Sequence, residues 1–216
     1  MPRPVRIDFV SDVVCPWCVI GLMELEQALR QSADAVTADI HFQPFELNPD
    51  MPPGGASLAE RLASKYGMSP EEIVAAHARM RSRAAEVGFD MRHRERTYNT
   101  FNAHRLLHWA RLEGRQTELK HALFAAYYTR GESLDDAEVL AGAAQAAGLD
   151  GQAAREVLSS DRYAEEVRAA EQHWRALGVN SVPSIIIEGK HLISGGQPAA
   201  VFEDALRKIA AEAERA

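Results

Sequence analysis

The chain has 216 residues, of which 46% are hydrophobic and 25% charged, and its net charge is −7 at pH 7. This length allows one domain, or one domain with an insertion, and a sizeable core. The acidic balance argues against nucleic acid as a general partner. The sequence shows neither a signal-like apolar segment at its N-terminus nor a run of about 20 apolar residues. We therefore expect a cytoplasmic protein with no membrane partner.

Two predicted elements meet at the only two cysteines of the chain. Residues 5–12 alternate apolar and polar side chains, which predicts a buried strand. Residues 15–30 repeat apolar side chains at helical spacing, which predicts a helix. Cys15 and Cys18 therefore lie at a strand-to-helix junction, with Pro16 at the first helical position, where its missing N–H removes no helix hydrogen bond.

The junction gives the two thiols different roles. The unpaired N–H groups and the positive dipole end of a helix N-terminus stabilise a thiolate. We therefore expect Cys15 to have a lowered pKa and to act as the nucleophile in thiol–disulfide exchange. Cys18, one turn into the helix and more buried, is placed to resolve the mixed disulfide. Pro16, between the two cysteines, is expected to tune the active site. Trp17 is expected either to tune the redox potential and shield the sulfurs or simply to pack on the surface.

Other uses of the cysteine pair are disfavoured. A structural zinc site needs about four ligands, and no second cysteine pair exists to supply them. A disulfide between Cys15 and Cys18 closes too short a loop to stabilise the fold much. His104 and His108 have metal-ligand spacing on one helix face, but no third ligand is evident. We therefore expect packing roles for these histidines and no metal.

The middle of the chain is predicted to be helical. A second strand is expected at residues 37–45, and the proline- and glycine-rich stretch after it marks a boundary. From Ser57 to about Leu177 the pattern is helical, with no strand signal. Ser69 is expected to start one helix. Ser133, followed by acidic residues at capping-box spacing, is expected to start another.

Two polar features of the sequence are expected to have structural rather than functional roles. Asp8, seven residues before Cys15, is more consistent with a strand-face carboxylate paired with water or backbone than with a proton relay for the thiols. The basic run at residues 92–96 is expected to be solvated surface rather than a binding patch.

The strand pattern returns near the C-terminus. Val182 and Pro183 precede a β-branched run at residues 185–187, which predicts a buried strand. Residues 191–193 are expected to form its hairpin partner. A final amphipathic helix follows.

The order strand, Cys-x-x-Cys helix, strand, helical insertion, Val-Pro, hairpin and helix resembles the DsbA superfamily over essentially the whole chain. The motifs similar to its FrnE-like branch are Cys15-Pro16-Trp17-Cys18, Phe45-Glu46-Leu47-Asn48-Pro49, Asn99-Thr100-Phe101-Asn102-Ala103-His104-Arg105 and Ser194-Gly195-Gly196-Gln197-Pro198. The resemblance implies an α/β, thioredoxin-like fold: a mixed sheet flanked by helices, with an all-α insertion between the second strand and the cis-Pro strand. The discontinuous thioredoxin-like domain would comprise residues 1–50 and 178–216, and the insertion residues 57–177.

The resemblance also implies roles for residues outside the cysteine motif. The peptide bond before Pro183 is expected to be cis and to lie against the cysteines, where Pro183 tunes the site. Pro183 would hold the backbone of Val182 open beside Cys15, so that an extended substrate strand can pair with it. Asn48 and its loop are expected either to line this cleft and bind substrate or to play a core or turn role.

The function that the resemblance implies is that of a thiol–disulfide oxidoreductase or isomerase, with the redox-active disulfide in place of a separate cofactor. Its substrates would be proteins or small molecules that carry thiols or disulfides, and glutathione stays open as a co-substrate. One alternative is a glutathione-dependent isomerase or transferase similar to 2-hydroxychromene-2-carboxylate isomerase. Those enzymes typically carry serine where Cys15 stands and lack the second cysteine. A second alternative is a non-catalytic redox-sensing or chaperone-like binding module.

Overall fold

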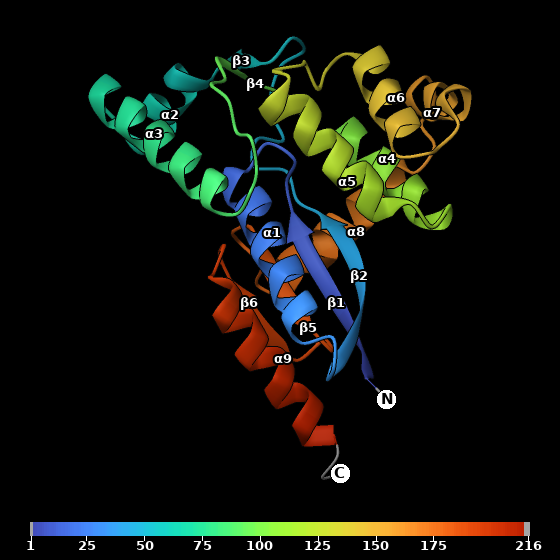
Figure 1. Ribbon diagram of the computed structural model, residues 1–216. Helices are drawn as coiled ribbons and strands as arrows, with labels where there is room; N and C mark the ends of the chain where they lie inside the picture. Colours follow the sequence, from blue (N-terminus) through green and yellow to red (C-terminus); the bar gives the residue numbers. More distant parts are fainter. Residues whose placement is uncertain (1, 214–216) are drawn as a thin grey trace.

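The computed structural model describes residues 2–213 and is organised around one four-stranded mixed sheet (Figure 1). The strand order is β2–β1–β5–β6. β1 (Arg3–Ser11) pairs in parallel with β2 (Val36–Pro44) and antiparallel with β5 (Ser184–Ile187). β5 pairs antiparallel with β6 (His191–Ser194). The predicted mixed sheet, with its C-terminal hairpin, is confirmed.

Helices cover both faces of this sheet. The other elements are α1 (Pro16–Gln31), β3 (Ala56–Ser57), α2 (Leu58–Tyr66), α3 (Pro70–Glu86), β4 (Arg96–Thr97), α4 (Phe101–Leu112), α5 (Gln116–Phe124), the π-helix η1 (Ala125–Thr129), α6 (Ala137–Ala146), α7 (Gly151–Leu158), α8 (Ala164–Ala176) and α9 (Ala199–Ala213). α1 and α9 lie together on one face, and α8 lies on the other (Figure 1). None of the helices within the described residues is both long enough and apolar enough to cross a membrane.

The alternation of side chains along β1 explains why both faces are buried. Ile7 and Phe9 point to the same face, because side chains two residues apart in a strand do so. Val10 points to the opposite face, where it packs with Trp174 of α8 and with Val179. All three β1 side chains are fully buried.

The helices α2 to α7 lie beyond the end of the sheet at which β1 is followed by α1 (Figure 1). The start of β1 and the end of α9 lie at the other end. The expectation that residues 57–177 contain no strand is wrong in one place, because β3 and β4 form a two-residue antiparallel pair. So short a strand leaves no alternation for a sequence pattern to reveal.

The two predicted helix starts in this region have different outcomes. Ser69 and Glu72 form a complete capping box, with each side chain accepting from the other residue's N–H at 3.2 and 2.8 Å. The start predicted at Ser133 is wrong. α6 begins after Asp136, whose carboxylate accepts from the N–H of Glu138 at 2.8 Å. The serine hydroxyl instead stabilises a turn before the helix.

Gly21 allows α1 to lie very close to two loops. A Cβ at this position would lie 3.1 Å from Pro183 Cγ and 3.3 Å from Gly196 Cα. Both distances are shorter than the roughly 3.5–4.0 Å of a good carbon–carbon contact. A glycine inside a helix costs roughly 1 kcal/mol of stability relative to alanine. At position 21 the glycine is nevertheless favoured, because a larger side chain would prevent this close approach.

We expect Gly21→Val to lower the free energy of unfolding by about 1–3 kcal/mol, because its extra carbons must displace Pro183 or the loop at Gly196. Chemical denaturation measures this change. Gly142→Val is the matched control, since Gly142 is an exposed helical glycine with no neighbouring atom within 4 Å of an added Cβ. Equal stability of the two variants would show that the close approach at Gly21 is not required.

Candidate active site

Cys15 and Cys18 lie where β1 ends and α1 begins, so the predicted strand-to-helix junction is confirmed. Cys15 is the N-cap residue of α1, and Pro16 lies in the first turn. The N–H of Cys18 donates to the carbonyl of Cys15 at 3.0 Å, which holds both residues in one tight turn. Both are free thiols; Cys15 is 4% exposed and Cys18 is fully buried.

The loop before β5 brings two more predicted site residues to the thiols. The Val182–Pro183 peptide bond is cis. The thiol of Cys15 donates a weak hydrogen bond to the carbonyl oxygen of Val182, with 3.6 Å between sulfur and oxygen. Segments far apart in the sequence thus meet at the Cys15 sulfur.

A cleft of about 560 Å³ opens beside Cys15. Most of the predicted site residues line it: Cys15, Pro16, Trp17, Asn48 and Val182. Trp17 is 40% exposed, so its ring forms part of the cleft wall and not of the core. Much of the facing wall is apolar and comes from α2 and α3, through Leu58, Leu62, Tyr66, Ala76 and Met80. The cleft can therefore hold an apolar substrate segment against the Cys15 sulfur.

Three cationic side chains line the same cleft, and none has a carboxylate partner among the described residues. Arg61 donates to Asn48 Oδ1 at 3.0 Å, and Lys65 donates to a backbone carbonyl at 2.9 Å. The guanidinium of Arg94 lies 4.3 Å from the ring centroid of Tyr128. Arg94 belongs to the basic run at residues 92–96, which is expected from the sequence to be solvated surface. That expectation is wrong for Arg94, because stacking on the rings of η1 holds its side chain in the cleft wall.

The environment of Cys18 opposes its ionisation. Burial, together with hydrogen bonding and charge from Cys15, raises the pKa of Cys18 well above its ordinary value. A buried thiolate loses its hydration, and a second thiolate nearby repels it. The positive charge of Lys120 acts in the opposite direction.

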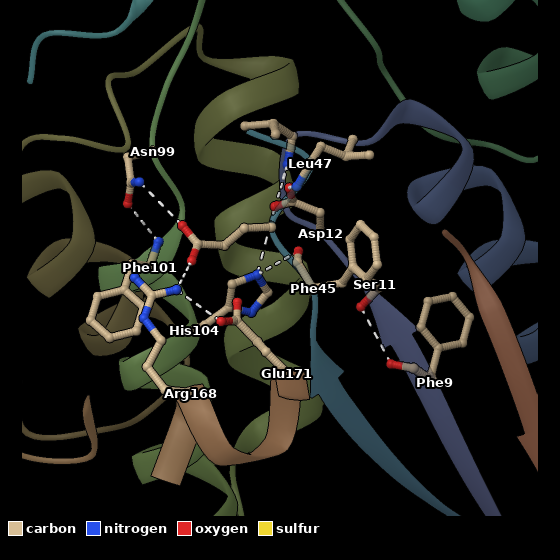
Figure 2. A network of polar contacts seen from close by, with 12 residues as sticks. Phe9, Ser11, Asp12, Phe45, Leu47, Asn99, Phe101, His104, Arg168 and Glu171 are labelled. Atoms are coloured by element: carbon tan, nitrogen blue, oxygen red, sulfur yellow. Dashed lines mark hydrogen bonds and ion pairs between the residues drawn. The ribbon is translucent and has the colours of Figure 1, made fainter. Parts of the chain in front are cut away.

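A buried polar network is centred on Asp12 and His104 (Figure 2). It lies next to the cysteines, because the N–H of Cys15 donates to the carbonyl of Asp12 at 3.2 Å. The fully buried Asp12 accepts from the N–H of Leu47 at 2.7 Å. His104 Nε2 lies 3.7 Å from Asp12 Oδ1 and 3.1 Å from the carbonyl oxygen of Phe45. Burial alone would raise the pKa of Asp12, but hydrogen bonds and charge from His104 and the Leu47 N–H outweigh it and lower that pKa. Asp12 therefore stays ionised and ties the loop after β2 to the turn before α1.

Arg168 and Glu171 of α8 belong to the same network (Figure 2). Glu46 forms an ion pair with Arg168, and Asn99 donates to Glu46 at 3.1 Å. Arg168 also pairs with Glu171 at 2.8 Å. Burial and the charge of Glu171 raise the pKa of Glu46 despite the arginine. One arginine thus stabilises two buried carboxylates beneath the loop that carries Asn48.

The remaining candidates take structural roles. The carboxylate of Asp8 accepts from Arg6 Nε at 2.9 Å and from Gln43 Nε2 at 2.7 Å. The structural role expected for Asp8 is confirmed, but the expectation of water or backbone as its partner is wrong, because side chains of β1 and β2 reach the carboxylate. The packing role predicted for the two histidines is confirmed: His104 joins the buried network, and the ring of His108 packs beside that of Tyr163. Across residues 2–213, no three His, Cys, Asp or Glu side chains are grouped to hold a metal ion.

Sequence reasoning missed Asp12, Arg94 and Lys120. Asp12 could have been found as an acidic residue inside an apolar run just before the first cysteine. Lys120 lies beside Leu119 and one turn before Leu123 and Phe124, on the buried face of α5. A charged residue on such a face is a signal, because lysines are almost never fully buried unless paired. Arg94 gives no local signal, since its position depends on rings from a distant helix.

Known proteins resemble this chain along nearly its whole length. The family described as DSBA-like thioredoxin domain matches residues 6–207. A probable DsbA oxidoreductase from Streptomyces coelicolor is 35% identical, with a TM-score of 0.89 over 94% of this chain and 89% of the other. Two structures with 15% identity share the fold. These are a 2-hydroxychromene-2-carboxylate isomerase (TM-score 0.71, 97% and 98% covered) and the cytosolic disulfide reductase DsbM from Pseudomonas aeruginosa with GSH (0.61, 98% and 100%).

The environment of Cys18 predicts low reactivity in the folded chain. In a Cys15→Ser variant, we expect iodoacetamide to alkylate Cys18 at pH 8 at least about tenfold more slowly than in the denatured chain, because the raised pKa lowers the thiolate fraction about tenfold per unit. Mass spectrometry over time measures the rate. Cys18→Ser, which leaves the cleft-lining Cys15, should react faster. Equal rates for Cys18 in the folded and denatured chains would contradict this assignment.

Proposed function

Because the chain belongs to the DSBA-like thioredoxin domain family, we propose that it is a thiol–disulfide oxidoreductase or isomerase, with Cys15 as nucleophile and Cys18 as resolving thiol. The observation that carries the proposal is the position of Cys15. It caps the N-terminus of α1, lines an apolar cleft and lies 3.6 Å from the carbonyl oxygen of Val182. A cytosolic location, which we propose with it, favours a catalytic over a structural cysteine pair.

In the proposed reaction, the thiolate of Cys15 attacks one sulfur of a substrate disulfide. The other substrate sulfur leaves as a thiolate and takes up a proton. Cys18 then attacks the Cys15 sulfur, which forms the Cys15–Cys18 disulfide and releases the second substrate thiol. The substrate gains two electrons and two protons, and the dithiol loses them. In reverse, the oxidised pair delivers a disulfide to a substrate dithiol.

Substrate would bind along the loop before β5. An extended segment can pair with the backbone of Val182, whose carbonyl already accepts from the Cys15 thiol. Pro183, packed beside Gly21 of α1, would keep this loop in place. Asn48, held by Arg61, would contribute from the opposite wall.

Trapping experiments test the assignment of the two thiols. Cys15→Ser should lower the rate of insulin disulfide reduction by at least about 100-fold, because it removes the attacking sulfur. Cys18→Ser should accumulate a mixed disulfide through Cys15, since nothing resolves it; non-reducing electrophoresis detects the adduct. Insulin reduction that persists in Cys15→Ser would overturn the proposal. Client protection that survives loss of both cysteines would instead favour a chaperone-like binding module.

The cations of the cleft favour glutathione as a co-substrate. Glutathione carries two carboxylates, and Arg61, Lys65 and Arg94 line the cleft without carboxylate partners among the described residues. The disulfide reductase DsbM, which shares the fold, has a solved structure with GSH. The chain keeps both cysteines, which favours dithiol exchange with glutathione over a glutathione-dependent isomerase. Activity that requires glutathione but survives loss of Cys18 would favour the isomerase or transferase.

We expect Arg94→Gln to raise the KM for oxidised glutathione about tenfold, because a hydrogen bond to a charged group contributes roughly 1.5–3 kcal/mol. Steady-state reduction of oxidised glutathione, with a dithiol reductant that regenerates the Cys15–Cys18 dithiol, measures this KM. Arg92→Gln is the matched control, since Arg92 is exposed and already paired with Asp90. An unchanged KM in a folded Arg94→Gln variant would show that the charge of Arg94 does not contribute to binding glutathione.

A further inference from the structure

Lys120 of α5 is fully buried, which is rare for a lysine without a partner. Its Nζ has no hydrogen-bond partner anywhere in residues 2–213. It lies 4.9 Å from the ring centroid of Phe124 and 5.8 Å from that of Phe42. These rings attract a cation but replace only part of its lost hydration. The fold therefore keeps a charged group at a position where a methionine would fit with less cost.

The titratable groups that act on Lys120 all belong to the candidate active site. They are Cys18, Asp12 and Cys15, from the end of β1 and the start of α1. Phe42 of β2 and Phe124 of α5 add no charge. Burial lowers the pKa of Lys120 to about 8, so the side chain is mostly an ammonium at pH 7 and mostly an amine above pH 9.

We propose that Lys120 is a positioning residue whose ammonium is the counter-charge for the Cys18 thiolate while Cys18 resolves the mixed disulfide. The inference rests on the proposed function. Cys18 is fully buried and has no other cation among the groups that act on it. A positive charge in the same low-dielectric interior favours the thiolate. The helical insertion, through α5, would thus take part in the chemistry of the dithiol.

The resolving step balances without an outside reagent. The Cys18 sulfur bonds to the Cys15 sulfur, and the bond between Cys15 and the substrate sulfur breaks. The substrate sulfur leaves with the electron pair and takes up the proton that Cys18 gave up. Lys120 begins and ends the step as an ammonium, because it supplies charge and not a proton.

Stopped-flow reaction of the reduced protein with 5,5′-dithiobis(2-nitrobenzoate) separates the two steps. Attack by Cys15 releases one thionitrobenzoate at a rate that depends on reagent concentration, and resolution by Cys18 releases the second at a rate that does not. We expect Lys120→Met to slow the second phase at least about tenfold at pH 7. The difference from wild type should shrink above about pH 8, where Lys120 loses its charge. A purely structural role would give a ratio that does not change with pH.

Two variants serve as controls. Lys208→Met removes an exposed lysine of α9 that is paired with Asp204, and should leave both phases unchanged. Lys120→Arg keeps the charge and should restore the second phase to within about threefold. Lys120→Met should melt at the same temperature as wild type or higher, because it removes an unpaired buried cation.

The outcomes separate this inference from the proposed function. If wild type releases no second thionitrobenzoate, the dithiol mechanism itself fails. If wild type shows both phases and folded Lys120→Met resolves as fast at pH 7, only the role of Lys120 is overturned. A folded Lys120→Arg variant as slow as Lys120→Met would also overturn it, since charge alone would not restore the step.

Discussion

The structure depends on how closely the start of α1 approaches the loop before β5. The sulfur of Cys15 reaches the carbonyl of Val182 because no side chain at Gly21 or Gly196 separates the helix from that loop. The sheet fixes both partners, since β1 delivers the helix and its neighbour β5 follows the loop directly. The Cys15 thiol and the Val182 carbonyl are thereby held together by main-chain geometry.

The helical insertion forms part of the site as well as covering it. His104 of α4 contacts Asp12, and Lys120 of α5 lies under the influence of both thiols. The rings of η1 hold Arg94 in the cleft wall. Buried side chains from the sheet and from the insertion belong to one continuous hydrophobic cluster. Changes in the insertion can therefore alter the chemistry of the dithiol without touching the cysteine motif.

The features that could be predicted from the sequence are those set by local patterns. Alternation located β1, and a β-branched run located the first strand of the C-terminal hairpin. The change from strand alternation to helical spacing located the junction at Cys15. The position of Arg94 could not be predicted, because it depends on rings from a distant helix. Lys120 could have been noticed as a charged residue on an apolar helix face, but its neighbours from β1 and α1 could not, because they come together only in the folded chain. The start of α6 was misplaced for a local reason: Asp136 competes with Ser133 as the cap, and the aspartate lies directly before the helix.

The start of β1 and the end of α9 lie together at the end of the sheet away from the insertion (Figure 1). The cleft and the Cys15 sulfur lie at the opposite end, where β1 is followed by α1. A bead, a surface or a second protein attached through the C-terminal helix would therefore leave the cleft facing outward. Immobilised in this orientation, the molecule would keep the cleft beside Cys15 open to the surrounding solution.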